Sequence, residues 1–327
     1  MANSKWHVGK PISDLRLLIS SLCALLFALC GSVDAQQTGK PFRIGFLDGG
    51  TAAGSAVLWD AFRQELSKLG WSEGKTDRLP ELAADLVRLK VDLIVVTEPS
   101  PALAAKSATT SIPIVMTNTS DPVGLGLVGS LARPGGNVTG FASLATELNT
   151  KRLEILKDAV PKLARVGLLR TSGGAIDAQL KELRAAAPVL KLKLDEIETQ
   201  FDAKGLDSAF QTAKQKQVGA VMTITTRRFF AERKRIVELA GKYRLPAIYF
   251  QKEFVDEGGL MSYGADYDDL YRRAAVYVDK ILKGAKPADL PVQQATKFEF
   301  VINLKAAKQI GLTIPVDLLQ RANKVIQ

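Results

Sequence analysis

The fold is decided by residues 112–122, which read IPIVMTNTSDP. Residues 112–116 form a short apolar run rich in β-branched side chains, which indicates a buried strand. Polar and turn-forming residues follow, and Asp121 before Pro122 favours the start of a helix over residues 123–131. In an open parallel sheet, ligands bind beyond the carboxyl ends of the strands. The stretch therefore predicts one side of a ligand pocket.

The same alternation of strand and helix extends in both directions from this stretch. Apolar runs that predict strands lie at residues 43–47, 91–96, 137–141, 166–169, 218–224 and 247–250, with helical spacing between them. Such alternation is typical of parallel sheets built from right-handed crossovers. Because the pattern restarts after a helix over 147–160, we expect two similar α/β lobes.

The C-terminal part departs from this alternation. A long helical pattern over 267–283 is followed by a proline-containing linker at 286–291 and a strand at 298–302. We infer that the chain passes between the lobes more than once and so makes a hinge. The expected first lobe is 40–142 plus 260–287, and the expected second lobe is 143–259 plus 293–327.

Residues 1–35 have the pattern of a cleavable signal peptide. Three basic residues precede an apolar run at 17–30, and small residues lead to a cleavage site near Ala35-Gln36. The alternative is an uncleaved membrane anchor, although the apolar run is short for a membrane span. The leader holds both cysteines and His7, the one histidine of the chain. The remaining chain therefore has no thiol or imidazole for a disulfide, a Cys/His metal site or nucleophilic catalysis with a histidine base. We expect no enzyme activity and no cofactor.

The net charge is positive with or without the leader. The whole chain has 44 Lys and Arg against 34 Asp and Glu, a net charge of +10, and the part after residue 35 keeps +9. Basic and acidic residues alternate along predicted helices, as in residues 231–235 (AERKR), which favours solvated helix faces. We therefore expect no nucleic-acid partner.

Several motifs resemble one family, the periplasmic substrate-binding proteins of ABC transporters, in the group that includes tryptophan-type binders. They are residues 77–83 (DRLPELA), 112–116 (IPIVM), 120–124 (SDPVG), 131–140 (LARPGGNVTG), 244–249 (RLPAIY), 258–264 (GGLMSYG) and 298–303 (FEFVIN). The resemblance implies two Rossmann-like lobes with three crossings, the type I periplasmic-binding-protein fold. It implies a periplasmic, monomeric protein that closes on a small molecule and delivers it to the membrane subunits of an ABC permease, without a reaction.

The resemblance, together with the predicted strand ends, indicates the ligand-binding residues. They are Asp48, Gly49, Gly50, Thr51, Thr97, Ser100, Asn118, Thr119 and Asp121 in the first lobe, Arg170, Thr171, Thr225, Arg227, Phe250 and Gln251 in the second, and Tyr263 near a crossing. Either arginine can hold a ligand carboxylate, although a surface position is the commoner outcome for arginine. Asp121 can bind a ligand amine or serve as a helix cap. The glycines at 124, 126 and 129 match a dinucleotide pattern but lie after the predicted helix start, so we expect them to serve packing.

One segment departs from the family pattern. Residues 71–76 (WSEGKT) join two helices where relatives carry a strand, so the first lobe is expected to lack an edge strand. Strand 43–47 would then be an exposed edge, open to pairing with another chain. The leading interpretation is a solute receptor for an amino acid or another small carboxylate. The alternatives are an exported α/β enzyme and a trimmed paralogue that has lost binding. A transcription regulator is disfavoured because the leader stands where its DNA-binding helices would be.

Overall fold

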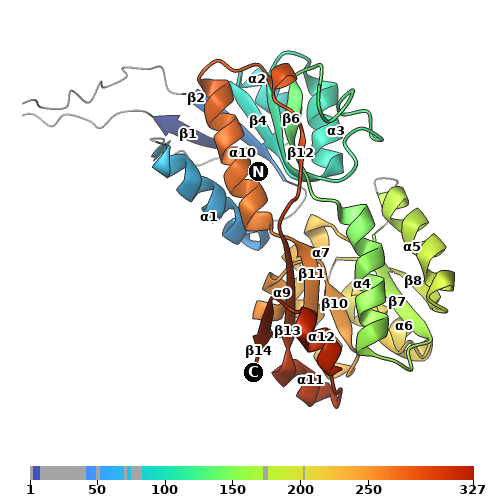
Figure 1. Ribbon diagram of the computed structural model, residues 1–327. Coiled ribbons are helices and arrows are strands. Elements are labelled where there is room, and N and C mark those ends of the chain that lie inside the picture. Colours follow the sequence, from blue (N-terminus) through green and yellow to red (C-terminus); the bar gives the residue numbers. More distant parts are fainter. Residues whose placement is uncertain are drawn as a thin grey trace, which may run out of the picture.

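The computed structural model describes residues 3–7, 42–48, 52–69, 72–74, 83–171, 176–201 and 203–327. The chain forms two α/β lobes, each a sheet covered by helices, with the C-terminus at the end of the second lobe (Figure 1). The predicted fold class is confirmed. Of the expected leader, only residues 3–7 fall among those described. None of the described helices is long and apolar enough to cross a membrane.

The first lobe is built on five parallel strands among the described residues. In spatial order they are β12 (Gln293–Gln294), β6 (Val138–Ala142), β5 (Ile114–Thr119), β4 (Leu93–Val96) and β2 (Phe42–Leu47). The stretch that predicted the pocket becomes β5, and all six residues of β5 are buried. Helices cover both faces of a parallel sheet, so a central strand such as β5 is buried on both faces, which explains the apolar run at its start.

The edge of this sheet differs from the prediction. Residues 71–76, expected to hold no strand, contain the short β3 (Ser72–Gly74), which forms the outermost strand of the sheet. Strand β3 does not pair with β2 itself. However, β1 (Asn3–His7) pairs with β2 in antiparallel register and also with β3. The prediction that strand 43–47 is an exposed edge is therefore wrong, because residues assigned to the leader supply its partner.

The second lobe repeats the arrangement with five parallel strands, followed by two strands that run in the opposite direction, among the described residues. Its order is β8 (Lys193–Glu198), β7 (Arg165–Arg170), β9 (Ala220–Thr223), β10 (Ala247–Tyr249), β11 (Met261–Ala265), β13 (Phe298–Asn303) and β14 (Lys324–Ile326). Strand β13 runs antiparallel to β11. The sequence KLDEIE of β8 is too polar to have been recognised as a strand.

Helices cover both sheets. The first lobe holds α1 (Ala52–Lys68), α2 (Ala83–Arg88), α3 (Pro99–Ala108) and α10 (Tyr267–Leu282); the second holds α4 (Ala145–Ala159), α5 (Asp177–Val189), α6 (Ala203–Gln215), α7 (Arg227–Ala231), α8 (Arg233–Lys242), α9 (Glu253–Asp256), α11 (Leu304–Ile310) and α12 (Val316–Arg321). Helices α1 and α10 lie side by side, although about 200 residues separate them in the chain (Figure 1).

The prediction of a helix over 123–131 is wrong, because this segment is a series of turns. Three glycines within nine residues explain this, because glycine disfavours helix.

Three segments cross between the lobes, within the described residues, and they bond to one another. They lie after β6, between β11 and α10, and between β12 and β13. The amide of Ala295 donates to the carbonyl of Ala142 at 2.8 Å, and the amide of Asp266 donates to that of Lys297 at 2.9 Å. The expected lobe boundaries shift accordingly. Residues 261–265 belong to the second sheet rather than the first lobe, and residues 293–294 belong to the first sheet rather than the second lobe.

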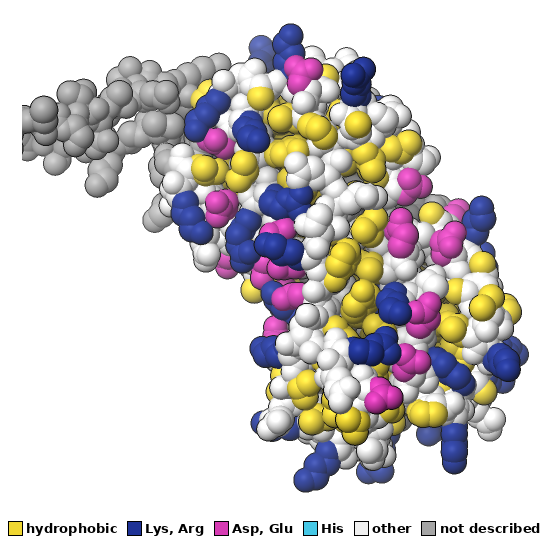
Figure 2. Space-filling view, viewed as in Figure 1, with side chains coloured by type: hydrophobic (Ala, Val, Ile, Leu, Met, Phe, Trp, Pro, Cys, Tyr) yellow, Lys and Arg dark blue, Asp and Glu magenta, His cyan; other side chains and the backbone are white. Residues whose placement is uncertain are grey.

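Charged side chains are mixed over the surface. On the face shown in Figure 2, basic and acidic groups alternate over both lobes rather than forming a basic patch. Several are paired along or between helices, such as Lys151 with Glu154 at 2.8 Å and Arg321 with Asp158 at 2.8 Å. Such exposed pairs contribute little stability, typically ~0–1 kcal/mol. The pattern agrees with the solvated helix faces inferred from the sequence.

A glycine at the β5–β6 contact provides a test of the fold. Gly140 has φ +132°, and an added Cβ would overlap the backbone of Met116 in β5. We predict that Gly140→Ala lowers the free energy of unfolding by about 2–4 kcal/mol, from backbone strain and overpacking. Urea unfolding followed by circular dichroism measures this. Gly136→Ala is the matched control, since its added Cβ meets no atom within 4 Å. Equal stability of the two variants would contradict the close β5–β6 approach.

Candidate functional site

Charged side chains from both lobes meet between the two sheets. Asp48 follows β2, Glu98 follows β4, and Arg227 begins α7 just beyond β9. The Arg227 Nε lies 3.4 Å from Asp48 Oδ1, and the Arg227 backbone amide donates to Glu98 Oε2 at 3.0 Å. These three residues, called here the interlobe cluster, stand where parallel strands bring their carboxyl ends together. Their position is the one expected of a ligand site in this architecture.

Arg227 is buried but incompletely paired. Its side chain is 3% exposed, and its guanidinium stacks over the Phe230 ring at 4.5 Å. Neither Nη1 nor Nη2 has a hydrogen-bond partner among the residues that the structure describes. Burial by itself would lower the pKa of Arg227, but Tyr271, Asp48 and Glu98 raise it above its usual value, so the group stays charged. A buried cation with two unused donors is costly unless an acceptor joins it.

The first lobe holds Asp48 in place through an aromatic group. Trp59 of α1 donates from Nε1 to Asp48 Oδ2 at 3.2 Å, and its ring packs edge-on against Phe46, Phe62 and Tyr271. Trp59 is only partly buried. It therefore combines a fixed hydrogen bond to the cluster with an accessible aromatic surface.

Glu98 has an unusual electrostatic environment. Burial raises the pKa of its carboxyl group, and Asp48 raises it too, while the Arg227 amide and guanidinium act in the opposite direction. The outcome is a pKa above the ordinary value for glutamate. The cluster thus combines the Arg227 guanidinium, the Asp48 carboxyl group and a Glu98 carboxyl group that holds its proton more readily than an exposed glutamate.

The carboxyl end of β5 adds buried polar groups. Thr117 donates to the Val96 carbonyl at 3.3 Å and to Asn118 Oδ1 at 2.7 Å, and Thr119 donates to the Thr97 carbonyl at 3.4 Å. Thr97 is fully buried, and its Oγ1 has no partner in the described chain. Thr97, Asn118 and Thr119 therefore all lie at the predicted edge of the sheet, held mainly by one another and by the β4 backbone.

In the second lobe, a second buried arginine supports the site. Arg152 of α4 donates to the Tyr263 carbonyl at 2.9 Å and to Thr225 Oγ1 at 2.8 Å, and also reaches Asn149. Gln179 bonds both the amide and the carbonyl of Thr225. Burial lowers the pKa of Arg152 to about 10. This network fixes the 225–227 loop, and with it the position of Arg227.

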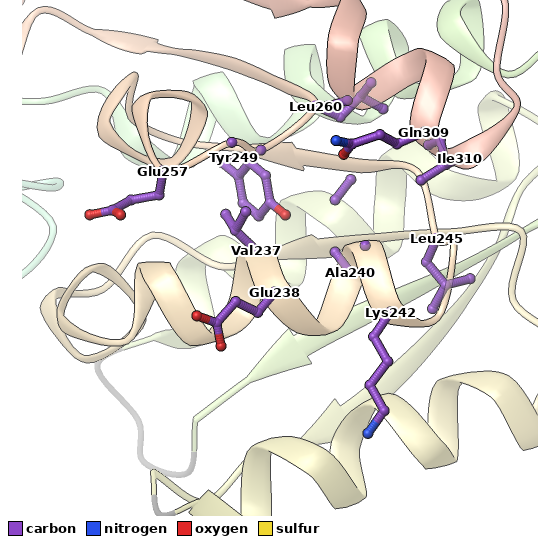
Figure 3. Close-up of a pocket in the computed structure, with 15 residues that line it drawn as sticks. Val237, Glu238, Ala240, Lys242, Leu245, Tyr249, Glu257, Leu260, Gln309 and Ile310 are labelled. Atoms are coloured by element: carbon purple, nitrogen blue, oxygen red, sulfur yellow. The ribbon is translucent and has the colours of Figure 1, made fainter.

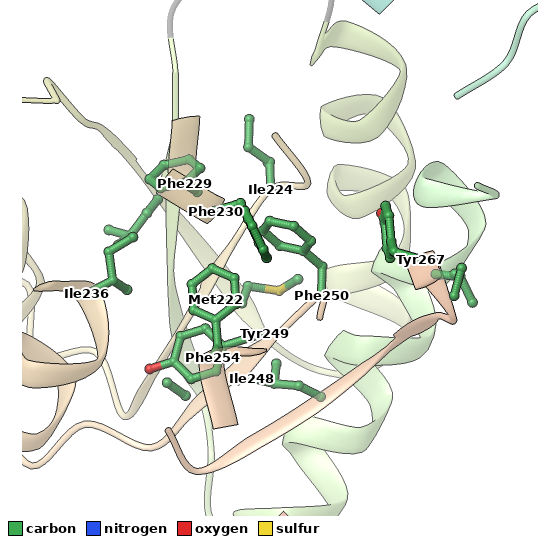
Figure 4. Packing of buried hydrophobic residues seen from close by; sticks show 14 of the residues in the cluster. Met222, Ile224, Phe229, Phe230, Ile236, Ile248, Tyr249, Phe250, Phe254 and Tyr267 are labelled. Atoms are coloured by element: carbon green, nitrogen blue, oxygen red, sulfur yellow. The ribbon is translucent and has the colours of Figure 1, made fainter. Parts of the chain in front are cut away.

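The loop after β10 contributes both core and polar residues. Phe250 is 2% exposed and packs edge-on against Phe254, so it belongs to the hydrophobic core (Figure 4). Gln251 is 3% exposed, and its Oε1 has no partner within the described residues. Next to it, burial raises the pKa of Glu253 to about 7, with Asp268 contributing.

Other predicted residues lie elsewhere. Ser100 is exposed on α3, and Asp121 is exposed in a turn, where it accepts from the Gly124 amide at 2.9 Å. Arg170 pairs with Glu196 and Glu198 on the neighbouring β8 at 3.1 and 3.2 Å. Thr171 is buried at the end of β7. Tyr263 is partly buried on β11, with its ring against Phe300. Gly49, Gly50 and Thr51 lie outside the described residues.

Sequence reasoning missed several members of the site. Glu98 lies in the strand-end loop 97–100, which was predicted to line the pocket, but it was not named among the ligand-binding residues. No such signal marks Arg152, Asn149 and Gln179. They lie within predicted helices, and the sequence leaves open which face of each helix turns toward the site. Trp59 was similarly hidden in the pattern of α1.

Comparisons with known proteins agree on one family. The family model described as "ABC transporter substrate binding protein" matches residues 48–326. A tyrosine-binding protein of Clostridioides difficile is 31% identical over 235 residues, which are 71% of this chain and 66% of the relative, so the match spans less than two thirds of that relative. A Streptococcus pneumoniae domain solved in complex with L-Trp has a TM-score of 0.75 at 27% identity, covering 86% of this chain and 100% of that one. A conserved domain protein of Vibrio cholerae has a TM-score of 0.75 at 28% sequence identity, covering 86% of this chain and 98% of that one.

The raised pKa of Glu253 predicts an unusual dependence of stability on pH. Between pH 4.5 and about 7, the folded protein keeps a proton on Glu253 that the unfolded chain releases. The free energy of unfolding therefore falls as pH rises, by up to roughly 3 kcal/mol from this group. Glu253→Gln should remove this pH-dependent loss. The free energy of unfolding of the variant should therefore rise relative to that of the wild type as pH increases.

Urea unfolding at intervals from pH 4.5 to 8 measures the difference. Glu182→Gln, at an exposed position of α5 away from Glu253, should keep the wild-type pH profile. Parallel profiles for the wild type and Glu253→Gln would show that Glu253 is not held in a desolvated site.

Proposed function

Because the chain belongs to the family of ABC transporter substrate-binding proteins, we propose that it captures a zwitterionic amino acid between its two lobes. It then delivers this small polar metabolite to the membrane subunits of an ABC importer. The observation that carries the proposal is the buried guanidinium of Arg227, with two donors that no described residue accepts. A carboxylate matches this pair of donors, because guanidinium and carboxylate form two parallel hydrogen bonds.

The charges of the interlobe cluster favour a zwitterion over a simple anion. Arg227 and Asp48 compensate each other, and the raised pKa of Glu98 makes it easier to hold neutral. An additional lone anion would leave uncompensated charge in a buried site, which is costly. A zwitterion adds none, because its carboxylate meets Arg227 while its ammonium group meets the oxygens of Asp48 or Glu98.

An aromatic side chain fits the surroundings best. Trp59 touches the cluster through Asp48 and is partly buried, so its ring offers an aromatic surface close to the charges. Tyr271 is fully buried and packs against this ring. The relatives named for tyrosine and solved with L-Trp point to the same ligand class. We therefore take L-tyrosine and L-tryptophan as the first ligands to test.

Lobe movement follows from the three crossings. Their mutual hydrogen bonds make a narrow connection, about which two lobes with separate sheets can rotate as hinged bodies. The contact of Arg227 with Asp48 and Glu98 joins the lobes on the side of α1 and α7. A ligand that binds residues of both lobes favours the closed arrangement by its difference in affinity for the two states.

The location follows from the same reading. The leader at residues 1–35 fits export with cleavage near Ala35-Gln36, which would remove β1 and leave β2 without that partner in the exported protein. Substrate-binding proteins work outside the cytoplasm. We propose a periplasmic protein that acts as a monomer and catalyses no reaction.

Isothermal titration calorimetry tests the role of Arg227. The wild type should bind L-tyrosine or L-tryptophan, and Arg227→Gln should weaken the affinity roughly 10- to 100-fold, the usual range for a lost charged hydrogen bond. Tyramine, which lacks the carboxylate, should bind the wild type weakly and lose little further affinity in the variant. This comparison assigns the loss to the carboxylate contact.

Arg228→Gln is the matched control, because Arg228 is the exposed neighbour of Arg227 on the same helix. It should bind within about twofold of the wild type. A well-folded wild type that binds neither amino acid would favour the trimmed paralogue, in which the Asp48–Arg227 contact has replaced the ligand. Equal affinity of Arg227→Gln and wild type would move the carboxylate site elsewhere.

A further inference from the structure

A pocket of about 380 Å³ lies in the second lobe, away from the interlobe cluster. It is bounded by α8, by α11 and by the loops that enter β10 and β11, as Figure 3 shows. Residues Leu245 and Leu260 precede these strands, whereas Gln251 follows β10 at the other end. The pocket therefore extends from the amino ends of these strands along β10 as far as Tyr249, its last residue, whereas the proposed amino-acid site stands beyond the carboxyl ends. Its volume is in the range of small-molecule sites.

Tyr249 points a buried hydroxyl group into this pocket. The side chain is 1% exposed, and its Oη has no hydrogen-bond partner in the described part of the chain. In Figure 3 the ring lies between α8 and α11, with its oxygen turned toward the side where Ala240 lies. A buried hydroxyl without a partner is unfavourable, and native proteins seldom leave one.

The ring of Tyr249 is held so that the hydroxyl cannot turn elsewhere. It stacks on Phe254 with the ring centroids 4.6 Å apart and the planes 7° from parallel. On its edge, Gly259 approaches so closely that an added Cβ would lie 2.7 Å from the Tyr249 ring. The orientation of the oxygen is thus set by packing, as in a preformed polar contact of a binding site.

Apart from Gln309, the rest of the lining inside its charged rim is apolar, and the rim residues are already paired. Val237, Ala240, Leu245, Ala247, Leu260, Ala306 and Ile310 supply the apolar walls. On the rim, Glu238 pairs with Arg235 at 3.4 Å, Lys242 with Asp207 at 3.5 Å, and Glu257 with Arg233 at 3.4 Å. An ionic ligand would have to break one of these pairs, so the lining favours a neutral molecule.

We propose that this pocket is a second binding site, which takes a small neutral molecule with an apolar body and one oxygen that hydrogen-bonds Tyr249 Oη. Aromatic and branched aliphatic alcohols or ketones have this chemistry. The site shares no residue with the interlobe cluster, so it is independent of the proposed amino-acid site.

Gly241 offers a way to fill the pocket. It lines the pocket at the end of α8, an added Cβ there meets no atom within 4 Å, and its backbone is not left-handed. Gly241→Leu therefore places a side chain in open space without a clash, and Gly241→Ala fills much less of it. Replacing glycine in a helix also favours the helix.

The probe is benzyl alcohol, with toluene as the analogue that lacks the oxygen, and binding is measured by saturation-transfer NMR titration. The wild type and Gly241→Ala should bind benzyl alcohol more tightly than toluene. Gly241→Leu should weaken binding of both at least tenfold. Tyr249→Phe should bind both probes equally, a loss of preference that a merely structural role of Tyr249 would not produce.

Three results would overturn the proposal: no saturation transfer with the wild type, unchanged binding in Gly241→Leu, or a preserved preference in Tyr249→Phe. Thermal melts identify any variant that fails to fold, and the two variants act at different positions, so the loss of one leaves the other decisive. Arg227→Gln should bind benzyl alcohol as the wild type does. Competition between benzyl alcohol and L-tryptophan would show instead that the probe occupies the interlobe site.

Discussion

Parallel strand pairing is the constraint on which the rest of this structure depends. It places the carboxyl ends of the five parallel strands of each sheet at one edge of that sheet. The connection between the lobes then brings these two edges together. Groups that follow β2, β4 and β9 therefore converge, although about 130 to 180 residues separate Arg227 from its partners. The convergence gathers charges that no local element could assemble. It also leaves the amino ends of the strands free, and there the second lobe forms its separate pocket.

Two buried arginines show how the same side chain can serve as framework or as binding group. Arg152 has acceptors in α4, in β11 and in the loop after β9, so its charge is dispersed and the surrounding backbone is fixed. Arg227 stands at the end of that fixed loop, with an aromatic ring on one face and two donors unused. The terminal nitrogens of Arg152 are both bonded, and these bonds hold in place the loop that carries Arg227. Preorganised donors of this kind lose little freedom when a ligand binds.

The sequence predicted the elements better than the directions of side chains. The apolar runs gave the two lobes and most strands, and Arg227 was placed correctly at a strand end because strand periodicity is strong. Asp121 turned outward because the three following glycines formed turns instead of a helix. Arg170 was drawn to carboxylates of β8, a strand too charged to recognise. The pairing of β1 with β2 could not be foreseen, since residues 3–7 read as part of a leader.

The interleaved path of the chain has a consequence for how the molecule is made. Helix α10 covers the first sheet and β12 completes its edge, yet both are synthesised after most of the second lobe. The second sheet in turn waits for β13 and β14, which end at Ile326. A nascent chain emerging from the ribosome therefore cannot finish either lobe until synthesis is nearly over. Domains that fold one after another as they emerge do not have this delay. The late closure keeps much of the chain unfinished for the duration of translation, and an unfinished chain can still be threaded through a narrow channel.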